Sequence, residues 1–344
     1  MQLPREVVVG EGVIERVAEI FHRLGFTGPA LIVTGSKTEG VAGKTVKEIL
    51  ENDGLRVETL KVGSANVWDV RAVEERIKVL RPQVVLGVGG GTKIDIAKLS
   101  SARQKVPFIS VPTTASHDGI ASPLSSIKGL EKPFSVMAQA PIAIVADTNI
   151  IMQAPFRFVA SGCGDVIAKF TAVKDWKLAR EIVGEYYGEY AASLALMSAE
   201  LVMQSAKQIR PGNEEGLRVL LEALISCGVA MSIAGSSRPC SGAEHLFSHA
   251  VDIIKPNSSM HGERCGVGTI MMAYLHGADW KRFQETLKTV GAPTSAKELG
   301  LTEDEVVRAL FIAPSIRPER YTILSKLKLS LEECRRVAKE TEVI

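Results

Sequence analysis

The first 150 residues alternate short runs of apolar, β-branched residues with longer segments in which apolar positions recur at helical spacing. The intervening helical pattern is clearest over Val13–Leu24, Val41–Asn52 and Val67–Leu80. Strand runs that are apolar on both faces are typical of a parallel sheet covered by helices. The pattern therefore predicts a Rossmann-like α/β domain. Its predicted strands are Glu6–Val9, Ala30–Thr34, Arg56–Val62, Val84–Val88, Phe108–Val111 and Ile142–Ala146.

From about Pro155 onward this alternation ends, and apolar residues recur every three or four positions in stretches rich in Ala, Leu, Met and Glu. A length of 344 residues also exceeds the usual size of one domain. We therefore expect a Rossmann-like, dinucleotide-binding domain at residues 1–154 and an all-α, metal- and substrate-binding domain at residues 155–344. The helices predicted in the second domain are Gly188–Gln208, Glu214–Ala234, Gly242–Asp252, Gly266–His276 and Trp280–Val290.

Composition and charge narrow the class of protein. The formal net charge is +2, which argues against the broad positive field of a nucleic-acid-binding protein. The most apolar helical stretch, Ala223–Gly235, is shorter than the roughly 20 residues that span a bilayer. The five cysteines are an odd number without C-x-x-C spacing, and no secretory signal precedes the first strand. We expect a cytoplasmic protein without membrane insertion.

Two polar loops follow neighbouring predicted strands. The strand Val84–Val88 leads through Gly89, Gly90 and Gly91 into a helix, an arrangement that lets backbone amides and the helix dipole hold a pyrophosphate. Neither the G-x-G-x-x-G spacing nor a Walker loop fits, so a simple tight turn is an equal alternative. The loop Pro112–Gly119 follows the next strand and should face the same crevice, although its hydroxyls could instead bond their own backbone.

The second predicted strand ends in Thr34-Gly35-Ser36-Lys37, with no acid at its tip. Enzymes that are specific for NAD often place a ribose-binding carboxylate there. We therefore expect NADP to be accepted as well as NAD.

Three histidines and one aspartate have the residue types of a metal site. His245 and His249 are four positions apart and share one face of a predicted helix, while His261 and Asp165 come from other elements. A histidine pair at this spacing is more often a surface feature, but the two further donors reverse that balance. The predicted set contains no thiolate, so zinc is favoured, with iron, manganese or nickel as alternatives. Spacing does not choose between His245 and His249 as the ligand.

These segments resemble the superfamily of iron-containing alcohol dehydrogenases, glycerol dehydrogenases and dehydroquinate synthases over essentially the whole chain. Gly89 to Lys98 resembles its phosphate loop, in which three glycines and a Ser or Thr precede an Asp and a Lys. Ser237 to His249, followed by His261 to Glu263, is more similar to the sn-glycerol-1-phosphate dehydrogenase family than to glycerol dehydrogenases. Pro112 to Gly119 and Ser161 to Asp165 are also similar to that family.

The resemblance implies a dehydroquinate synthase-like fold and a role for each matched residue. Asp165, His245 and His261 would bind the metal, one zinc ion per subunit. Asp118 and His249 would contact the substrate and act in catalysis, and Asp165 would also contact the substrate. The residues that would bind NAD(H) or NADP(H) are Gly91, Thr92, Lys93, Ile94, Asp95, Thr113, Thr114, Ala115, Ser116 and Ser122.

The implied reaction is the reversible NAD(P)H-dependent reduction of dihydroxyacetone phosphate to sn-glycerol 1-phosphate, which supplies the backbone of archaeal ether lipids. We expect a homo-oligomer. The main alternative is a metal-dependent glycerol dehydrogenase acting on unphosphorylated polyols. A dehydroquinate synthase-like lyase ranks third, and a binding protein without catalysis ranks last. Basic residues near the metal motifs could hold the substrate phosphate, and the sequence does not choose among Arg238, Lys169, Lys255 and Arg264.

Overall fold

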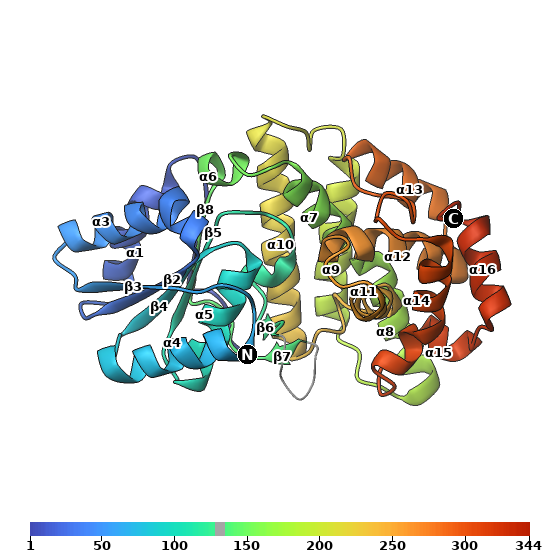
Figure 1. The fold of residues 1–344 in the computed structure, drawn as a ribbon, viewed down its shortest axis with the longest axis horizontal. Helices are drawn as coiled ribbons and strands as arrows, with labels where there is room; N and C mark the ends of the chain where they lie inside the picture. The colour runs from blue at the N-terminus through green and yellow to red at the C-terminus, as the bar shows by residue number, and fades with distance from the viewer. Residues whose placement is uncertain (128–134) are drawn as a thin grey trace. The chain divides into compact units, whose positions relative to one another are not determined.

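The computed structural model describes residues 1–127 and 135–344, and the chain divides into two compact units, Met1–Pro155 and Phe156–Ile344. The first unit contains a parallel sheet of strand order β1-β8-β5-β4-β2-β3 (Figure 1). The predicted Rossmann-like architecture is therefore confirmed. The strands of this sheet are β1 (Glu6–Gly10), β2 (Ala30–Thr34), β3 (Val57–Lys61), β4 (Val84–Gly89), β5 (Phe108–Pro112) and β8 (Ala143–Asp147).

The central strands β2, β4, β5 and β8 are buried along their whole length. This explains why their sequences are continuously apolar rather than alternating. A short antiparallel pair, β6 (Leu124–Ser125) with β7 (Val136–Met137), follows β5. The described helices of this unit are η1 (Val13–Arg16), α1 (Val17–Arg23), α2 (Ser36–Thr38), the π-helical η2 (Glu39–Gly43), α3 (Lys44–Asn52), α4 (Val67–Leu80), α5 (Gly91–Arg103), η3 (Asp118–Ile120) and α6 (Thr148–Met152).

Buried Asp147, the last residue of β8, connects the sheet to the two helices η1 and α6. Its carboxylate accepts hydrogen bonds from the backbone of Asn149 at 3.0 Å and Ile150 at 3.3 Å, and so caps α6. The other carboxylate oxygen accepts from the backbone N–H of Ile14 at 3.0 Å. One side chain therefore satisfies amides at the beginning of two helices.

The second unit is helical in its described elements, as predicted from the change in apolar spacing. Helix α10 (Glu214–Ala234) is long and apolar enough to cross a membrane, but 61% of its most apolar window is buried inside the structure, as in a core helix. The other helices are α7 (Arg157–Ile167), α8 (Lys169–Val183), α9 (Glu189–Gln204), α11 (Ala243–Ile254), α12 (His261–Leu275), α13 (Trp280–Thr289), α14 (Glu303–Ile316), α15 (Ile323–Leu327) and α16 (Leu331–Glu340).

The largest difference between a predicted and an observed helix boundary is at the beginning of α12. The sequence pattern placed the start of a helix at Gly266, whereas α12 begins at His261. Glycine is a poor helix former, so Gly262 and Gly266 made the first turn of this helix resemble a loop in the sequence pattern. In the structure they allow α7 to pack closely against α12, because a Cβ atom at Gly262 would overlap the backbone oxygen of Ser161. Tertiary packing overrides local propensity here.

We predict that Gly164→Ala destabilises the second unit, because its added methyl group would overlap the backbone oxygen of Gly262. Overpacking of this kind costs about 1–3 kcal/mol. Chemical denaturation should show the loss, and zinc content should fall because α7 and α12 carry predicted metal ligands. Gly40→Ala is the matched control, since its methyl group meets no atom within 4 Å. Unchanged stability and zinc content in Gly164→Ala would contradict this account.

Candidate functional site

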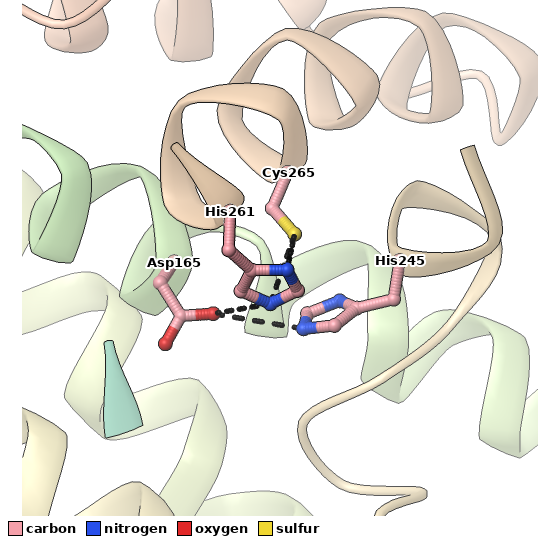
Figure 2. A group of neighbouring side chains, drawn as sticks. All are labelled: Asp165, His245, His261 and Cys265. Carbon is pink, nitrogen blue, oxygen red and sulfur yellow. Dashed lines mark hydrogen bonds and ion pairs between the residues drawn. The ribbon is translucent and has the colours of Figure 1, made fainter. Parts of the chain in front are cut away.

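Three helices of the second unit bring four possible metal donors together. Asp165 comes from α7, His245 from α11, and His261 and Cys265 from α12. Figure 2 shows these side chains pointing toward one another, and their donor atoms all lie within 4.8 Å of each other. Asp165 Oδ1 is 3.6 Å from His245 Nε2 and 3.8 Å from His261 Nε2. The structure thus brings the predicted aspartate and two of the predicted histidines into one group.

The spacing of these atoms fits a divalent cation. Zinc bonds of about 2.0–2.3 Å place two ligand atoms of a tetrahedral site roughly 3.3–3.8 Å apart. The two distances from Asp165 to the histidines agree with this spacing, as does the 3.5 Å distance from Cys265 Sγ to His261 Nε2. Carboxylate, imidazole and thiolate donors are all common zinc ligands. The residues present therefore fit a bound zinc ion.

Cys265 was missed in the sequence analysis. It lies four positions after His261, which places both residues on one face of α12 and is the spacing that could have identified it. The signal was lost because the helix was predicted to begin at Gly266. The expectation of a donor set without sulfur therefore does not describe the group that the structure assembles.

Neighbouring side chains fix both histidine rings. His245 Nδ1 donates to the buried carboxylate of Glu244 at 2.9 Å, and that carboxylate also accepts from Thr171 Oγ1 at 2.8 Å. His261 Nδ1 shares a hydrogen bond of 3.3 Å with Ser248 Oγ. These bonds hold the Nε2 atoms toward Asp165, which is how partners outside a metal site usually orient its imidazoles.

The charges around Asp165 keep its carboxylate ionised. Burial opposes ionisation, but Lys169 and the two histidines lower the pKa of Asp165 well below its ordinary value. Lys169 Nζ lies 2.9 Å from Asp165 Oδ1, the oxygen atom that faces both histidines. Burial also disfavours the charged form of His261 and, with the neighbouring His245, lowers its pKa. Asp165 and His261 therefore have the protonation states that metal ligation requires.

His249 lies one turn beyond His245 on α11, and its ring centroid is 6.1 Å from that of His261. Burial and the neighbouring cationic groups lower the pKa of His249 to about 3. Its imidazole is therefore neutral at physiological pH and can donate a hydrogen bond without carrying charge.

The structure separates the basic residues that the sequence had left as alternatives. Lys169 pairs with Asp165, and Lys255 Nζ lies 3.3 Å from Glu305 at the surface. Arg264 makes a bidentate ion pair with Asp252, at 2.5 and 3.0 Å. Arg238 pairs with Glu185 at 2.9 Å, so all four cations have a carboxylate partner. Arg238 differs in that its Nη1 atom is buried without a hydrogen-bond partner among the described residues.

In the first unit, the two predicted nucleotide loops lie next to each other at the carboxyl ends of β4 and β5. The backbone N–H of Thr113 donates to the oxygen of Gly89 at 3.0 Å. The His117 ring packs between the loops, so closely that a Cβ atom at Gly91 or at Gly119 would overlap it. Gly91 opens α5, whose first N–H groups have no acceptor within the helix. This corner has the geometry of an anion-binding helix N-terminus.

Asp95 and Lys98 of the glycine motif are buried inside this corner. Asp95 accepts a hydrogen bond from the backbone of Ser126 at 3.1 Å and lies 3.3 Å from Lys98 Nζ. Lys98 also donates to the backbone oxygens of Gly119 at 2.8 Å and Leu124 at 2.6 Å. Both side chains therefore hold the loops in place.

The other residues expected to bind the nucleotide line the same corner. Thr92 is exposed and Lys93 is partly exposed on the first turn of α5, and the side chain of Ile94 is buried beneath them. Thr114 and Ser116 are partly exposed, whereas Thr113, Ala115 and Ser122 are buried. Asp118 begins the short helix η3, and its backbone oxygen accepts from the N–H of Ser122 at 3.0 Å.

Comparison with known proteins agrees with the fold. A family model described as iron-containing alcohol dehydrogenase matches residues 8–155. The solved structure of glycerol dehydrogenase from Schizosaccharomyces pombe superposes with a TM-score of 0.82 at 22% identity, covering 99% of this chain and 90% of that one. The fold is thus that of iron-containing alcohol dehydrogenase-like proteins.

Sequence relatives narrow this class. A glycerol-1-phosphate dehydrogenase (NAD(P)+) from Methanosarcina mazei is 52% identical over 344 residues, which cover 100% of this chain and 96% of the relative. A protein of the same name from Thermococcus kodakarensis is 54% identical over 345 residues, covering 100% of this chain and 98% of the relative. The chain belongs to the glycerol-1-phosphate dehydrogenase family.

We predict that Glu244→Gln weakens zinc binding while the protein stays folded. The substitution keeps the size of the side chain but removes the charge that orients His245. Loss of such a partner typically lowers metal affinity by about 10–100-fold. Competition with a chelator measures the change. Glu222→Gln, which removes an exposed partner of Arg218, is the control. Equal zinc affinity in the two variants would show that Glu244 does not position His245.

We also predict that Gly91→Ala weakens NADH binding, because its methyl group would displace the His117 ring and separate the two loops. We expect the dissociation constant of NADH to rise roughly tenfold, which corresponds to a loss of about 1.4 kcal/mol in binding free energy. Fluorescence titration with NADH measures it. Zinc content should not change, because the metal donors belong to the other unit. Wild-type NADH affinity in this variant would argue against a nucleotide site at this corner.

Proposed function

We propose that this chain catalyses the reversible NAD(P)H-dependent reduction of dihydroxyacetone phosphate to sn-glycerol 1-phosphate. The observation that carries the proposal is the group of buried Asp165, buried His245 and partly exposed His261. It occurs in a chain more than half identical, over its full length, to proteins named glycerol-1-phosphate dehydrogenase. The glycerol dehydrogenase alternative has weaker support, because the likeness to such an enzyme is at 22% identity and concerns the fold.

The two domains take separate tasks in this proposal. Residues 1–154 bind NAD(H) or NADP(H), with Gly91 to Asp95, Thr113 to Ser116, and Ser122 in contact with the dinucleotide. The adjacent loops and the beginning of α5 support this assignment. Glu39, the acid nearest the tip of β2, forms an ion pair with Lys61 at 3.1 Å, which supports acceptance of NADP as well as NAD. Residues 155–344 bind the metal and the substrate.

Asp165, His245 and His261 hold one zinc ion in the proposed site. A bound divalent cation supplies Lewis-acid stabilisation of the negative charge that develops on the substrate oxygen during hydride transfer. Lys169 holds Asp165, and Glu244 and Ser248 hold the two histidine rings. Asp165 also contacts the substrate. Catalytic zinc sites usually pair three protein ligands with a position for water or substrate, so Cys265 is assigned no bond to the ion in this proposal.

Asp118 and His249 are the proposed catalytic residues. The neutral imidazole of His249 donates a hydrogen bond to the substrate and can pass a proton to the reduced oxygen, with Asp118 supplying the proton through water as the other route. The burial that keeps His249 uncharged supports its role as a neutral donor.

The proposed role is supply of the glycerophosphate backbone of archaeal ether lipids by a cytoplasmic enzyme that is not inserted in a membrane. All five cysteines are buried, and their odd number fits a reducing compartment.

We also propose a homo-oligomer. Helix α9 exposes three large apolar side chains at spacings of seven and four residues: Tyr190, Met197 and Leu201. Their exposure supports an apolar contact surface on that helix.

We predict that zinc-loaded protein oxidises NADH and NADPH with dihydroxyacetone phosphate, giving sn-glycerol 1-phosphate in a chiral product assay. The Asp165→Ala and His261→Ala variants should lose their zinc, and their turnover should fall about 100-fold. Electrostatic stabilisation of a developing charge commonly contributes that much to turnover. Both variants should still bind NADH. Preference for unphosphorylated dihydroxyacetone would favour the glycerol dehydrogenase alternative, and normal turnover in zinc-depleted variants would refute the metal assignment.

A further inference from the structure

A buried arginine of the second unit has no carboxylate partner. Arg320 is 8% exposed, and its guanidinium donates to the backbone oxygen of Ser241 and, at 2.7 Å, to Ser237 Oγ. Both acceptors are neutral, and among the described residues no ion pair with a carboxylate is formed by Arg320. A buried charge is costly unless an opposite charge accompanies it. The positive charge of Arg320 is therefore available to an anion.

Two more arginines surround this charge. Arg238 is 4% exposed and donates at 2.9 Å both to Glu185 and to the backbone oxygen of Tyr321, next to Arg320. Its Nη1 atom is buried and lacks a hydrogen-bond partner in the described part of the chain. Arg317 pairs at 3.1 Å with Glu319, whose side chain is largely exposed. Burial, Arg317 and Arg238 lower the pKa of Arg320 to about 9, against the opposing effect of Glu185 and Glu244.

This cluster, defined as Arg238, Arg317 and Arg320, lies beside the metal group. Arg320 contacts Ser237 and Ser241. Both serines lie in the segment that leads into α11, the helix of His245 and His249. Arg317 follows the last residue of α14, and α14 packs against α11 (Figure 1). Arg317 and Arg320 are also among the cations that lower the pKa of His249, so their field reaches the residue proposed to contact the substrate.

On the basis of the proposed function, we infer that Arg238, Arg317 and Arg320 form the subsite for the phosphate group of dihydroxyacetone phosphate. Arg320 supplies the uncompensated charge, Arg317 adds a second guanidinium, and Arg238 holds the Arg320 segment through Tyr321 and offers its unpartnered Nη1. Guanidinium groups bind phosphate oxygens with two parallel hydrogen bonds, which gives strength and orientation. An unphosphorylated triose would leave this charge unmatched, so the cluster would select the phosphorylated substrate.

The experiment compares wild type with Arg317→Gln and Arg320→Lys on dihydroxyacetone phosphate and on dihydroxyacetone. Losing a charge-assisted hydrogen bond weakens binding by roughly 10–100-fold. The ratio of kcat/KM for dihydroxyacetone phosphate to kcat/KM for dihydroxyacetone should fall by that factor, mainly through a higher KM for the phosphorylated substrate. The inhibition constant of inorganic phosphate should rise in parallel. Arg335→Gln, which loses an exposed ion pair with Asp304, is the matched control and should keep the wild-type ratio.

The outcomes separate this inference from the proposed function. If wild type reduces dihydroxyacetone phosphate selectively but both variants keep its substrate ratio and phosphate inhibition, the subsite is wrong and the function stands. If wild type prefers dihydroxyacetone, the proposed function fails and this inference fails with it. Arg317 is partly exposed, so Arg317→Gln should fold normally and keeps the test decisive if Arg320→Lys is unstable.

Discussion

The close approach of α7 and α12 is the constraint on which the candidate metal centre depends. At Gly164 and Gly262 the two helix backbones are nearer than any side chain would allow, and this contact places Asp165 of α7 opposite His261 of α12. Because one carboxylate oxygen must lie within a few ångströms of an imidazole from another helix, the interhelical distance sets the donor spacing. Because glycine has no Cβ atom, the distance between the two helices can stay this short.

Buried hydrogen bonds fix the position of α11 in the same unit. Asp175 of α8 accepts a backbone hydrogen bond from Ala243 at 2.7 Å, at the beginning of α11, and another from Ile323 at 2.6 Å. Glu244 adds its bond to His245 from the same first turn. Carboxylates in this interior remain satisfied by amides and imidazoles, so ring orientation and helix position are fixed by one network.

Charge is distributed unevenly across the second unit. Around the donor group, each cation considered for the substrate phosphate has an acidic partner, as Lys169 has Asp165 and Arg264 has Asp252. Positive charge without a buried counterion remains near Arg320. A nearly neutral chain can therefore present a local site for an anion, since a small net charge says little about any one pocket.

The order of elements, the parallel sheet, the helical second part and the candidate donors Asp165, His245 and His261 follow from the sequence alone, because apolar spacing and motif spacing are local. It did not reveal Cys265, whose helix was hidden by glycines that only packing explains. It also could not choose among the four cations that it offered and did not single out Arg320, because partners such as Glu185 for Arg238 lie 53 positions away in the chain. Tertiary structure decided these points, since burial and charge pairing are set by residues distant in sequence.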